Sequence, residues 1–142
     1  MRGPDLGPEK GVHKLKLTED QLQLLREPHL AYVATANRDG SPQVTPVWVD
    51  TDGEAIVFNT ARGRLKWRNL ERDPRVSITV VDPANPETRV IIAKGRAVFI
   101  QEGALEHMDG LSRKYDGKPW TPVPGQVRVI VKVVPDRITG AD

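Results

Sequence analysis

A dense run of basic side chains follows a short apolar segment near the middle of the chain. Residues 62–75 contain six basic side chains and only two acidic ones, Glu71 and Asp73. The basic residues are Arg62, Arg64, Lys66, Arg68, Arg72 and Arg75. Guanidinium and ammonium groups directed at one point suit a phosphate ester, because they donate charge-assisted hydrogen bonds to its oxygens. The cluster therefore indicates either a phosphate site or a solvated helix face whose charges pair with one another.

The elements around this basic cluster place it at the start of a helix. A helix is predicted over about residues 64–72, because apolar residues recur there at helical spacing and Pro74 ends the pattern. The free N–H groups at a helix N-terminus attract an anion, and Gly63 lets the backbone approach a phosphate closely. Asn59 and Thr60, at the end of the preceding apolar run, add neutral hydrogen-bonding groups.

The composition excludes several classes of protein. The 142 residues, 38% hydrophobic and 28% charged, are expected to form one soluble domain over 17–142 behind a loose N-terminal arm, 1–16. There is no cysteine, which excludes disulfides, thiolate catalysis and zinc–cysteine sites. His13, His29 and His107 follow no metal-ligand spacing, so no metal site is predicted. The sequence also lacks a serine-nucleophile motif, a P-loop and a Rossmann glycine pattern.

The basic cluster is a local feature of a chain whose net charge is only +2. Trp48 or Trp67 could stack on nucleic-acid bases beside the cluster. Aromatic residues are only 5% of the chain, however, and form no repeating pattern with the basic ones, so a nucleic-acid partner is not predicted. A membrane partner is not predicted either, because no segment approaches the ~20 apolar residues that cross a bilayer. Without an apolar signal segment, a cytoplasmic location is expected.

Alternating apolar residues and turn signals predict a small β-barrel. Strands are expected at 30–37, 42–50, 55–60, 75–82, 88–101 and 127–135, and helices at 18–27, 64–72 and 105–115. Asp-Gly turns at 39–40 and 52–53 join the first three strands, which predicts a three-stranded antiparallel meander. Six strands joined mostly by short turns favour a mainly β fold, a closed or partly closed barrel.

Single residues give further local predictions. Thr18, with Gln21 three residues later, forms a capping-box pattern at the start of the first helix. Pro46 limits the ladder bonding of its strand and indicates an edge, a bulge or a ligand-facing stretch. Gly95 predicts a bend or bulge within the long strand.

The middle of the sequence, "VATANRDGSPQVTPVWVDTDGEAIVFNTARGRLKWRNLERDPRVSITVVDP", resembles the pyridoxamine-phosphate-oxidase-like split-barrel flavoproteins. It is most similar to the actinobacterial branch that uses the deazaflavin coenzyme F420. The run "NTARGRLKWRNLERDPRVS" is the most specific part of a likeness that extends from about Leu30 to Gly95 and, more weakly, to the final strand. The resemblance implies a six-stranded split barrel, a homodimer and cofactor clefts at the dimer interface.

The resemblance also implies which residues bind the cofactor. They are Gln43, Thr45, Pro46, Val47 and Trp48 beside the ring and ribityl chain, Asn59 and Thr60 at the strand end, and Arg64, Leu65 and Lys66 at the phosphate. This assignment favours the phosphate interpretation of the basic cluster over the solvated face.

The activity that the resemblance implies is a reductase that transfers a hydride from reduced F420 to a small organic acceptor. FMN is an alternative cofactor, because it shares the ring–ribityl–phosphate stem, and a non-catalytic cofactor-binding protein is an alternative function. Oxidation of vitamin B6 phosphates is not expected, since the chain ends "VVPDRITGAD" and lacks the Arg- and Trp-containing segment of true pyridoxamine-phosphate oxidases. Tyr115 and water are the candidate proton donors.

Overall fold

The computed structural model describes residues 15–140 of the chain. Its elements are α1 (Glu19–Arg26), β1 (Ala31–Ala36), β2 (Pro42–Val47), β3 (Val49–Thr51), β4 (Ile56–Ala61), α2 (Leu65–Arg72), β5 (Arg75–Val81), β6 (Val90–Ile100), α3 (Ala104–Asp116) and β7 (Arg128–Thr139). The predicted arm, 1–16, lies outside the described residues except for Leu15 and Lys16, which are exposed. No helix within residues 15–140 is long and apolar enough to cross a membrane.

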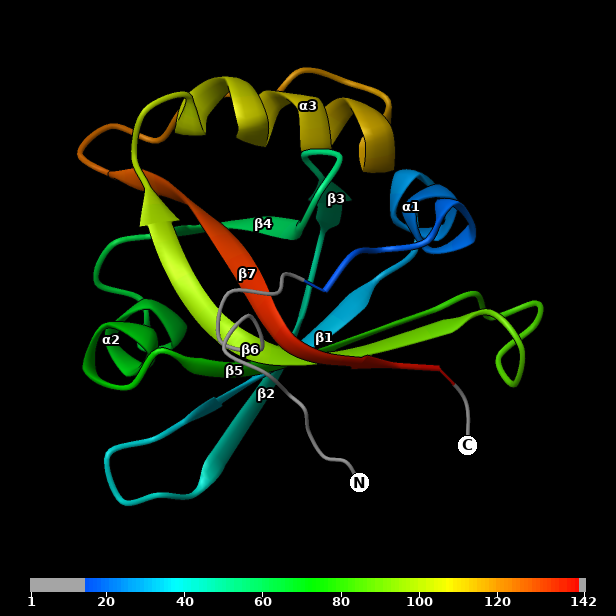
Figure 1. Cartoon of the computed structure of the whole chain (residues 1–142). Helices are drawn as coiled ribbons and strands as arrows, with labels where there is room; N and C mark the ends of the chain where they lie inside the picture. The colour runs from blue at the N-terminus through cyan, green and yellow to red at the C-terminus, as the bar shows by residue number, and fades with distance from the viewer. Residues whose placement is uncertain (1–14, 141–142) are drawn as a thin grey trace.

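One curled antiparallel sheet contains all seven strands of the described chain, in the order β2-β1-β5-β6-β7-β4-β3 (Figure 1). Its two edge strands, β2 and β3, are consecutive in sequence and separated only by Trp48. The sheet must therefore curl until its edges meet at Trp48, which produces a barrel. The prediction of a mainly β barrel is confirmed.

Two details of the predicted strands are wrong. The expected strand 42–50 is two strands, β2 and β3, that belong to opposite edges of the sheet. The expected meander is not formed, because β4 pairs with β3 and β7 and does not pair with β2. Turn residues indicate only the pairing of strands that are consecutive in sequence, whereas the β4–β7 pairing joins segments about 70 residues apart. Pro46 lies on edge strand β2 opposite Tyr32, where no further strand needs its missing N–H.

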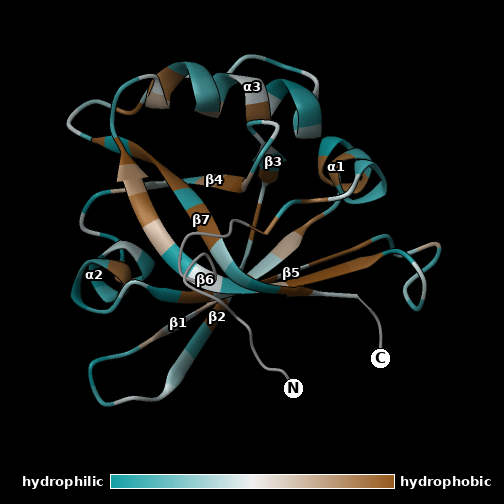
Figure 2. Cartoon of the chain, in the orientation of Figure 1, coloured by the Kyte–Doolittle hydropathy of each residue, from teal (hydrophilic) through white to brown (hydrophobic). Residues whose placement is uncertain are grey.

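The core fills the inside of the barrel. The largest fully buried apolar side chains come from six strands and three helices: Phe58, Leu25, Leu70, Ile78, Ile91, Leu111, Val33, Val49 and Val131 are among them. Figure 2 shows apolar residues concentrated along the strands, with hydrophilic residues on the loops and outer helix surfaces. The capping box at α1 is confirmed, since the Thr18 hydroxyl accepts from the Gln21 N–H at 3.1 Å and Gln21 Oε1 accepts from the Thr18 N–H at 2.9 Å.

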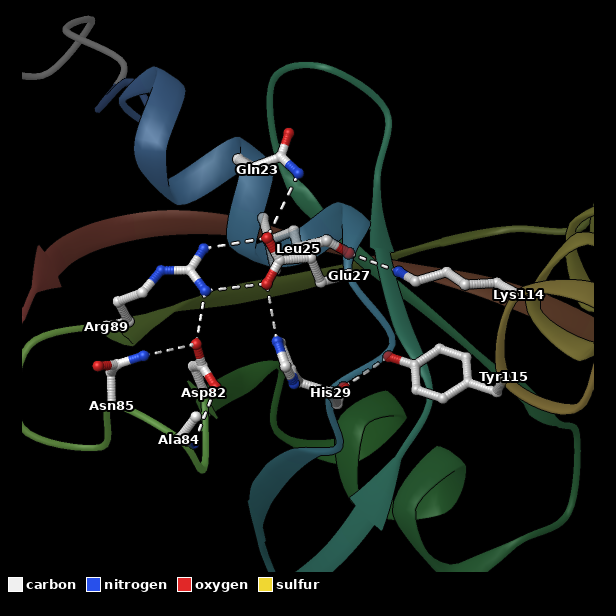
Figure 3. Close-up of polar contacts among 10 residues, drawn as sticks. All are labelled: Gln23, Leu25, Glu27, His29, Asp82, Ala84, Asn85, Arg89, Lys114 and Tyr115. Atoms are coloured by element: carbon white, nitrogen blue, oxygen red, sulfur yellow. Dashed lines mark hydrogen bonds and ion pairs between the residues drawn. The ribbon is translucent and has the colours of Figure 1, made fainter.

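A polar network, here called the α1 clasp, ties the end of α1 to the loop between β5 and β6 (Figure 3). Arg89 Nη1 lies 2.9 Å from Glu27 Oε1 and 2.6 Å from Asp82 Oδ2, and His29 Nε2 lies 2.9 Å from Glu27 Oε1. Glu27, His29 and Asp82 could together hold a metal ion, a grouping that their sequence spacing did not predict. Arg89 bridges the two carboxylates, so this guanidinium already supplies the positive charge of the cluster.

Acid should weaken the α1 clasp. The hydrogen bonds from Arg89 and then from His29 lower the pKa of Glu27 from 4.5 to about 2. Because the folded pKa lies below the unfolded one, the contribution of Glu27 to stability is complete above pH 4.5 and is lost as the pH falls toward 2. We expect the melting temperature to fall over this window, and Arg89→Gln to lower it at neutral pH and to flatten its acid dependence.

The control for this measurement is Arg26→Gln, which removes only an exposed ion pair with Glu19. That variant should keep the wild-type acid profile. An equally steep acid profile in Arg89→Gln and in the wild type would contradict the role given to Glu27.

Candidate functional site

A cleft of about 390 Å³ opens where the ends of β2 and β4 and the start of α2 meet α3. Its lining residues are Leu30, Pro46, Val47, Trp48, Asn59, Thr60, Arg64, Lys66, Met108 and Leu111. Seven of the ten predicted cofactor-binding residues are among them: Pro46, Val47, Trp48, Asn59, Thr60, Arg64 and Lys66. The sheet register brings the two segments together, since Val49 pairs with Phe58 and Trp48 therefore lies near Asn59.

The other three predicted cofactor-binding residues do not line the cleft. Gln43 lies opposite Thr35 and its Oε1 accepts from the Thr35 hydroxyl at 3.3 Å. The Thr45 hydroxyl is buried and has no hydrogen-bond partner in the part of the chain that the structure describes. Leu65 is 41% exposed at the first turn of α2. A cofactor role for these three residues stays a prediction.

Two cations of the cleft have no counter-ion within residues 15–140. Neither Arg64, which is exposed, nor Lys66, which is partly buried, forms an ion pair with a carboxylate there. Burial, followed by the charges of Arg64 and Arg128, lowers the pKa of Lys66. Arg64 is also the N-cap of α2, where free backbone N–H groups favour an anion. This end of the cleft is therefore suited to bind an anion.

A polar group behind the cleft orients Asn59. Arg128 Nε donates to Asn59 Oδ1 at 2.8 Å, and Asn59 Nδ2 donates to the Ala104 carbonyl and to His107 Nδ1, both at 3.0 Å. Because arginine can only donate, the amide oxygen must face Arg128 and the amide nitrogen must face His107. The His107 ring is thus neutral with its proton on Nε2, which agrees with the lowering of its pKa by burial.

One buried hydroxyl in the lining has no partner. Thr60 is 2% exposed, and its Oγ1 forms no hydrogen bond within the described residues. A buried polar atom without a partner costs free energy, typically about 1–3 kcal/mol. A ligand that offers a donor or an acceptor at this point would remove that cost. The hydroxyl and the two cations therefore fit a ligand that combines a phosphate with polar groups.

Tyr115 supports the aromatic wall of the cleft. Its ring stacks on Trp48 with the centroids 5.3 Å apart and the planes 11° from parallel. Its hydroxyl donates to the His29 carbonyl at 2.6 Å and accepts from the Val49 N–H at 3.1 Å. Burial raises the pKa of Tyr115 to about 12. A hydroxyl that is bound to the backbone and held protonated is a poor proton donor, so Tyr115 positions Trp48 instead.

Removing this hydroxyl should destabilise the fold. Tyr115→Phe leaves the Val49 N–H and the His29 carbonyl without their side-chain partner, so we expect a loss of about 1–3 kcal/mol in the free energy of unfolding. Urea denaturation measures it. Tyr32→Phe is the matched control, because Tyr32 is 43% exposed, and it should change stability by less than about 0.5 kcal/mol. Equal effects of the two variants would contradict the support role.

Sequence reasoning missed Arg128 and His107 as parts of this site. Neither residue belongs to a motif, and the only signal was an arginine within an otherwise Val-rich strand. Arg128 reaches the site because it pairs in register with Ala61, three residues before Arg64.

Known proteins share this architecture over nearly the whole chain. The sequence profile described as "Pyridoxamine 5'-phosphate oxidase" matches residues 17–139. An F420H2-dependent biliverdin reductase of Mycobacterium tuberculosis (strain CDC 1551 / Oshkosh) is 28% identical over 128 residues, which are 89% of each chain. A solved structure named "F420 Reductase" is 31% identical, with a TM-score of 0.74, and the match covers 87% of this chain and 98% of that one.

A second solved structure, a conserved hypothetical protein from Mycobacterium tuberculosis, is 25% identical with a TM-score of 0.71. That match covers 91% of this chain and 86% of the other. The curled sheet is thus the split-barrel fold of these proteins.

Proposed function

Because the chain belongs to the pyridoxamine 5'-phosphate oxidase family, we propose that it is a reductase that uses the deazaflavin coenzyme F420. Two relatives, 28% and 31% identical, are named for F420 and support this choice of coenzyme. The observation that carries the proposal is the cleft itself, where, among residues 15–140, Arg64 and Lys66 lack counter-ions and the nearby Thr60 hydroxyl lacks a partner.

The lining residues divide into two groups with different tasks. Arg64 and Lys66 bind the phosphate of the coenzyme, and Thr60 offers its hydroxyl to the adjoining polar chain. Pro46 and Trp48 provide an apolar wall that excludes water from the ring. When bound, the reduced coenzyme supplies a hydride to the acceptor, so the protein needs no nucleophile of its own.

The acceptor is proposed to be a small organic molecule with an electron-poor double bond. Its reduction consumes one hydride and one proton, while the coenzyme is oxidised. The Tyr115 hydroxyl is bound to the backbone. Water therefore supplies the proton in this proposal.

A homodimer is part of the same proposal. Exposed apolar side chains lie on the face of the sheet that points away from the barrel interior: Val44, Val98, Ile100 and Val134. Burying them against a second copy would gain the usual free energy of apolar burial. Light scattering should give about twice 15.8 kDa. A monomer that binds the coenzyme with full affinity would contradict the dimer.

Stopped-flow oxidation of the reduced coenzyme tests the activity. We expect its absorbance to change only when the protein and an acceptor from a panel of enones and quinones are both present. Lys66→Ala should slow the reaction at low coenzyme concentration and approach the wild-type rate at saturation, because Lys66 acts in binding. Tight binding without turnover on any acceptor would contradict a reductase and favour a cofactor-binding protein.

A further inference from the structure

We propose that Arg128 is a third cation of the phosphate site and contacts the same oxyanion as Arg64 and Lys66. This role rests on the proposed function. The residue is separated from the basic cluster by more than 50 positions in sequence. It nevertheless lies next to the cleft, since Asn59 and Met108, which both line the cleft, are its hydrogen-bonding neighbours.

The guanidinium of Arg128 is buried but incompletely bonded. The residue is only 8% exposed, and no carboxylate within residues 15–140 forms an ion pair with it. Within the described residues, three of its five N–H groups have partners: Asn59 Oδ1 at 2.8 Å, Gln126 Oε1 at 3.2 Å and the Met108 sulfur at 3.2 Å. A thioether is a weak acceptor. A buried charge with spare donors costs free energy unless an anion balances the charge and accepts the remaining hydrogen bonds.

Three like charges meet at this end of the cleft. Burial, and to a smaller extent the charge of Arg64, lowers the pKa of Arg128. Burial also lowers the pKa of Lys66, and the charges of Arg64 and Arg128 lower it further. The Arg128 guanidinium carbon lies over the ring of Trp120, 5.3 Å from the ring centroid, in a cation–π contact. One oxyanion bound among the three cations would relieve their mutual repulsion.

A purely structural role is the competing explanation, because Arg128 also holds Asn59 in place. The two roles are separated by pairs of ligands in which only one member carries a phosphate. FMN and riboflavin form one pair, and coenzyme F420 and its phosphate-free deazaflavin core form the other. Titration calorimetry gives the affinity for each.

Arg128→Gln should lower the affinity for the phosphate-bearing ligand by about tenfold or more, the loss expected from one charge-assisted hydrogen bond. The affinity for the phosphate-free partner should change by less than about threefold, the size of an ordinary surface effect. Arg137→Gln is the matched control, because Arg137 is an exposed arginine on the same strand. Equal losses for both ligands in Arg128→Gln would overturn the proposal in favour of a structural role.

Gln126→Glu tests the same role without removing Arg128. Gln126 Oε1 lies 3.2 Å from Arg128 Nη1, so the isosteric glutamate would supply a counter-ion from within the chain. We expect a higher melting temperature together with phosphate affinity that is about tenfold weaker. A higher melting temperature with unchanged phosphate affinity would overturn the proposal. This variant decides the matter if Arg128→Gln fails to fold.

Arg64→Gln separates this role from the proposed function. If Arg64→Gln loses its preference for phosphate while Arg128→Gln and Gln126→Glu keep it, the role of Arg128 is overturned and the phosphate site stands. If the wild type binds FMN alone and Arg128→Gln loses the preference for FMN over riboflavin, the choice of coenzyme is overturned and the role of Arg128 is upheld. A wild type that binds FMN and riboflavin equally well, and the coenzyme and its core equally well, overturns both.

Discussion

Replacing Arg64 or Lys66 by alanine should lower the affinity for the coenzyme by on the order of 10- to 100-fold. In the proposed phosphate site, each change removes one or two charge-assisted hydrogen bonds, each worth roughly 1.5–3 kcal/mol, and about 1.4 kcal/mol is a factor of ten. The fold should keep its stability or gain a little, because the cluster loses a like charge that has no counter-ion within residues 15–140. Equilibrium titration of the coenzyme measures the affinity.

Arg68→Ala is the control for these two variants. Arg68 is exposed on the same helix and is not part of the cleft lining. Arg72 is less suitable, because it donates to the Ala36 carbonyl and to Asn69 and so holds α2 against β1. Equal losses at residues 64, 66 and 68 would indicate diffuse attraction without a shaped site. Unchanged affinity at residues 64 and 66 would contradict a phosphate site at the start of α2.

Replacing Gly95 by alanine should destabilise the fold by about 3 kcal/mol or more. An added Cβ would lie 2.1 Å from the Val134 carbonyl oxygen and 2.8 Å from Pro135 Cα. Both contacts are with backbone, which cannot turn aside as a side chain can. The clash falls at the register shift between Lys94 and Gly95, where β6 bends against β7. Urea denaturation measures the loss, and failure to fold is its extreme form.

Replacing Gly110 by alanine should instead stabilise the fold. Gly110 lies within α3, and an added Cβ there meets nothing within 4 Å. Alanine favours a helix interior over glycine by about 0.5–1 kcal/mol, so Gly110→Ala should stabilise the fold by that amount. Similar effects of the two substitutions would contradict the close backbone approach at Gly95.

Local signals in the sequence predict several features of the fold around the site. The apolar residues at helical spacing and the stop at Pro74 predict a helix over 64–72, and the structure has α2 at Leu65–Arg72. Gly95 predicts a bulge, and a register shift occurs there. These features succeed because each depends on a few adjacent residues, whose φ, ψ and capping preferences are readable from residue type.

Long-range pairing limits what the sequence can predict. Trp48 looks like the middle of one strand, yet the chain there passes from one edge of the sheet to the other. Arg128 and Tyr115 reach the cleft only through the β4–β7 ladder and the packing of α3, which no local pattern specifies. The Arg72 side chain, one of several similar cations in sequence, is distinguished only by its bond to β1.

Parallel titration with coenzyme F420 and FMN tests whether the cleft binds F420. The purified chain is mixed with each cofactor, unbound cofactor is removed by gel filtration, and the bound fraction is measured from its absorbance spectrum. We expect the chain to retain F420, and F420 to displace FMN. Retention of FMN alone, or of neither cofactor, would contradict this expectation.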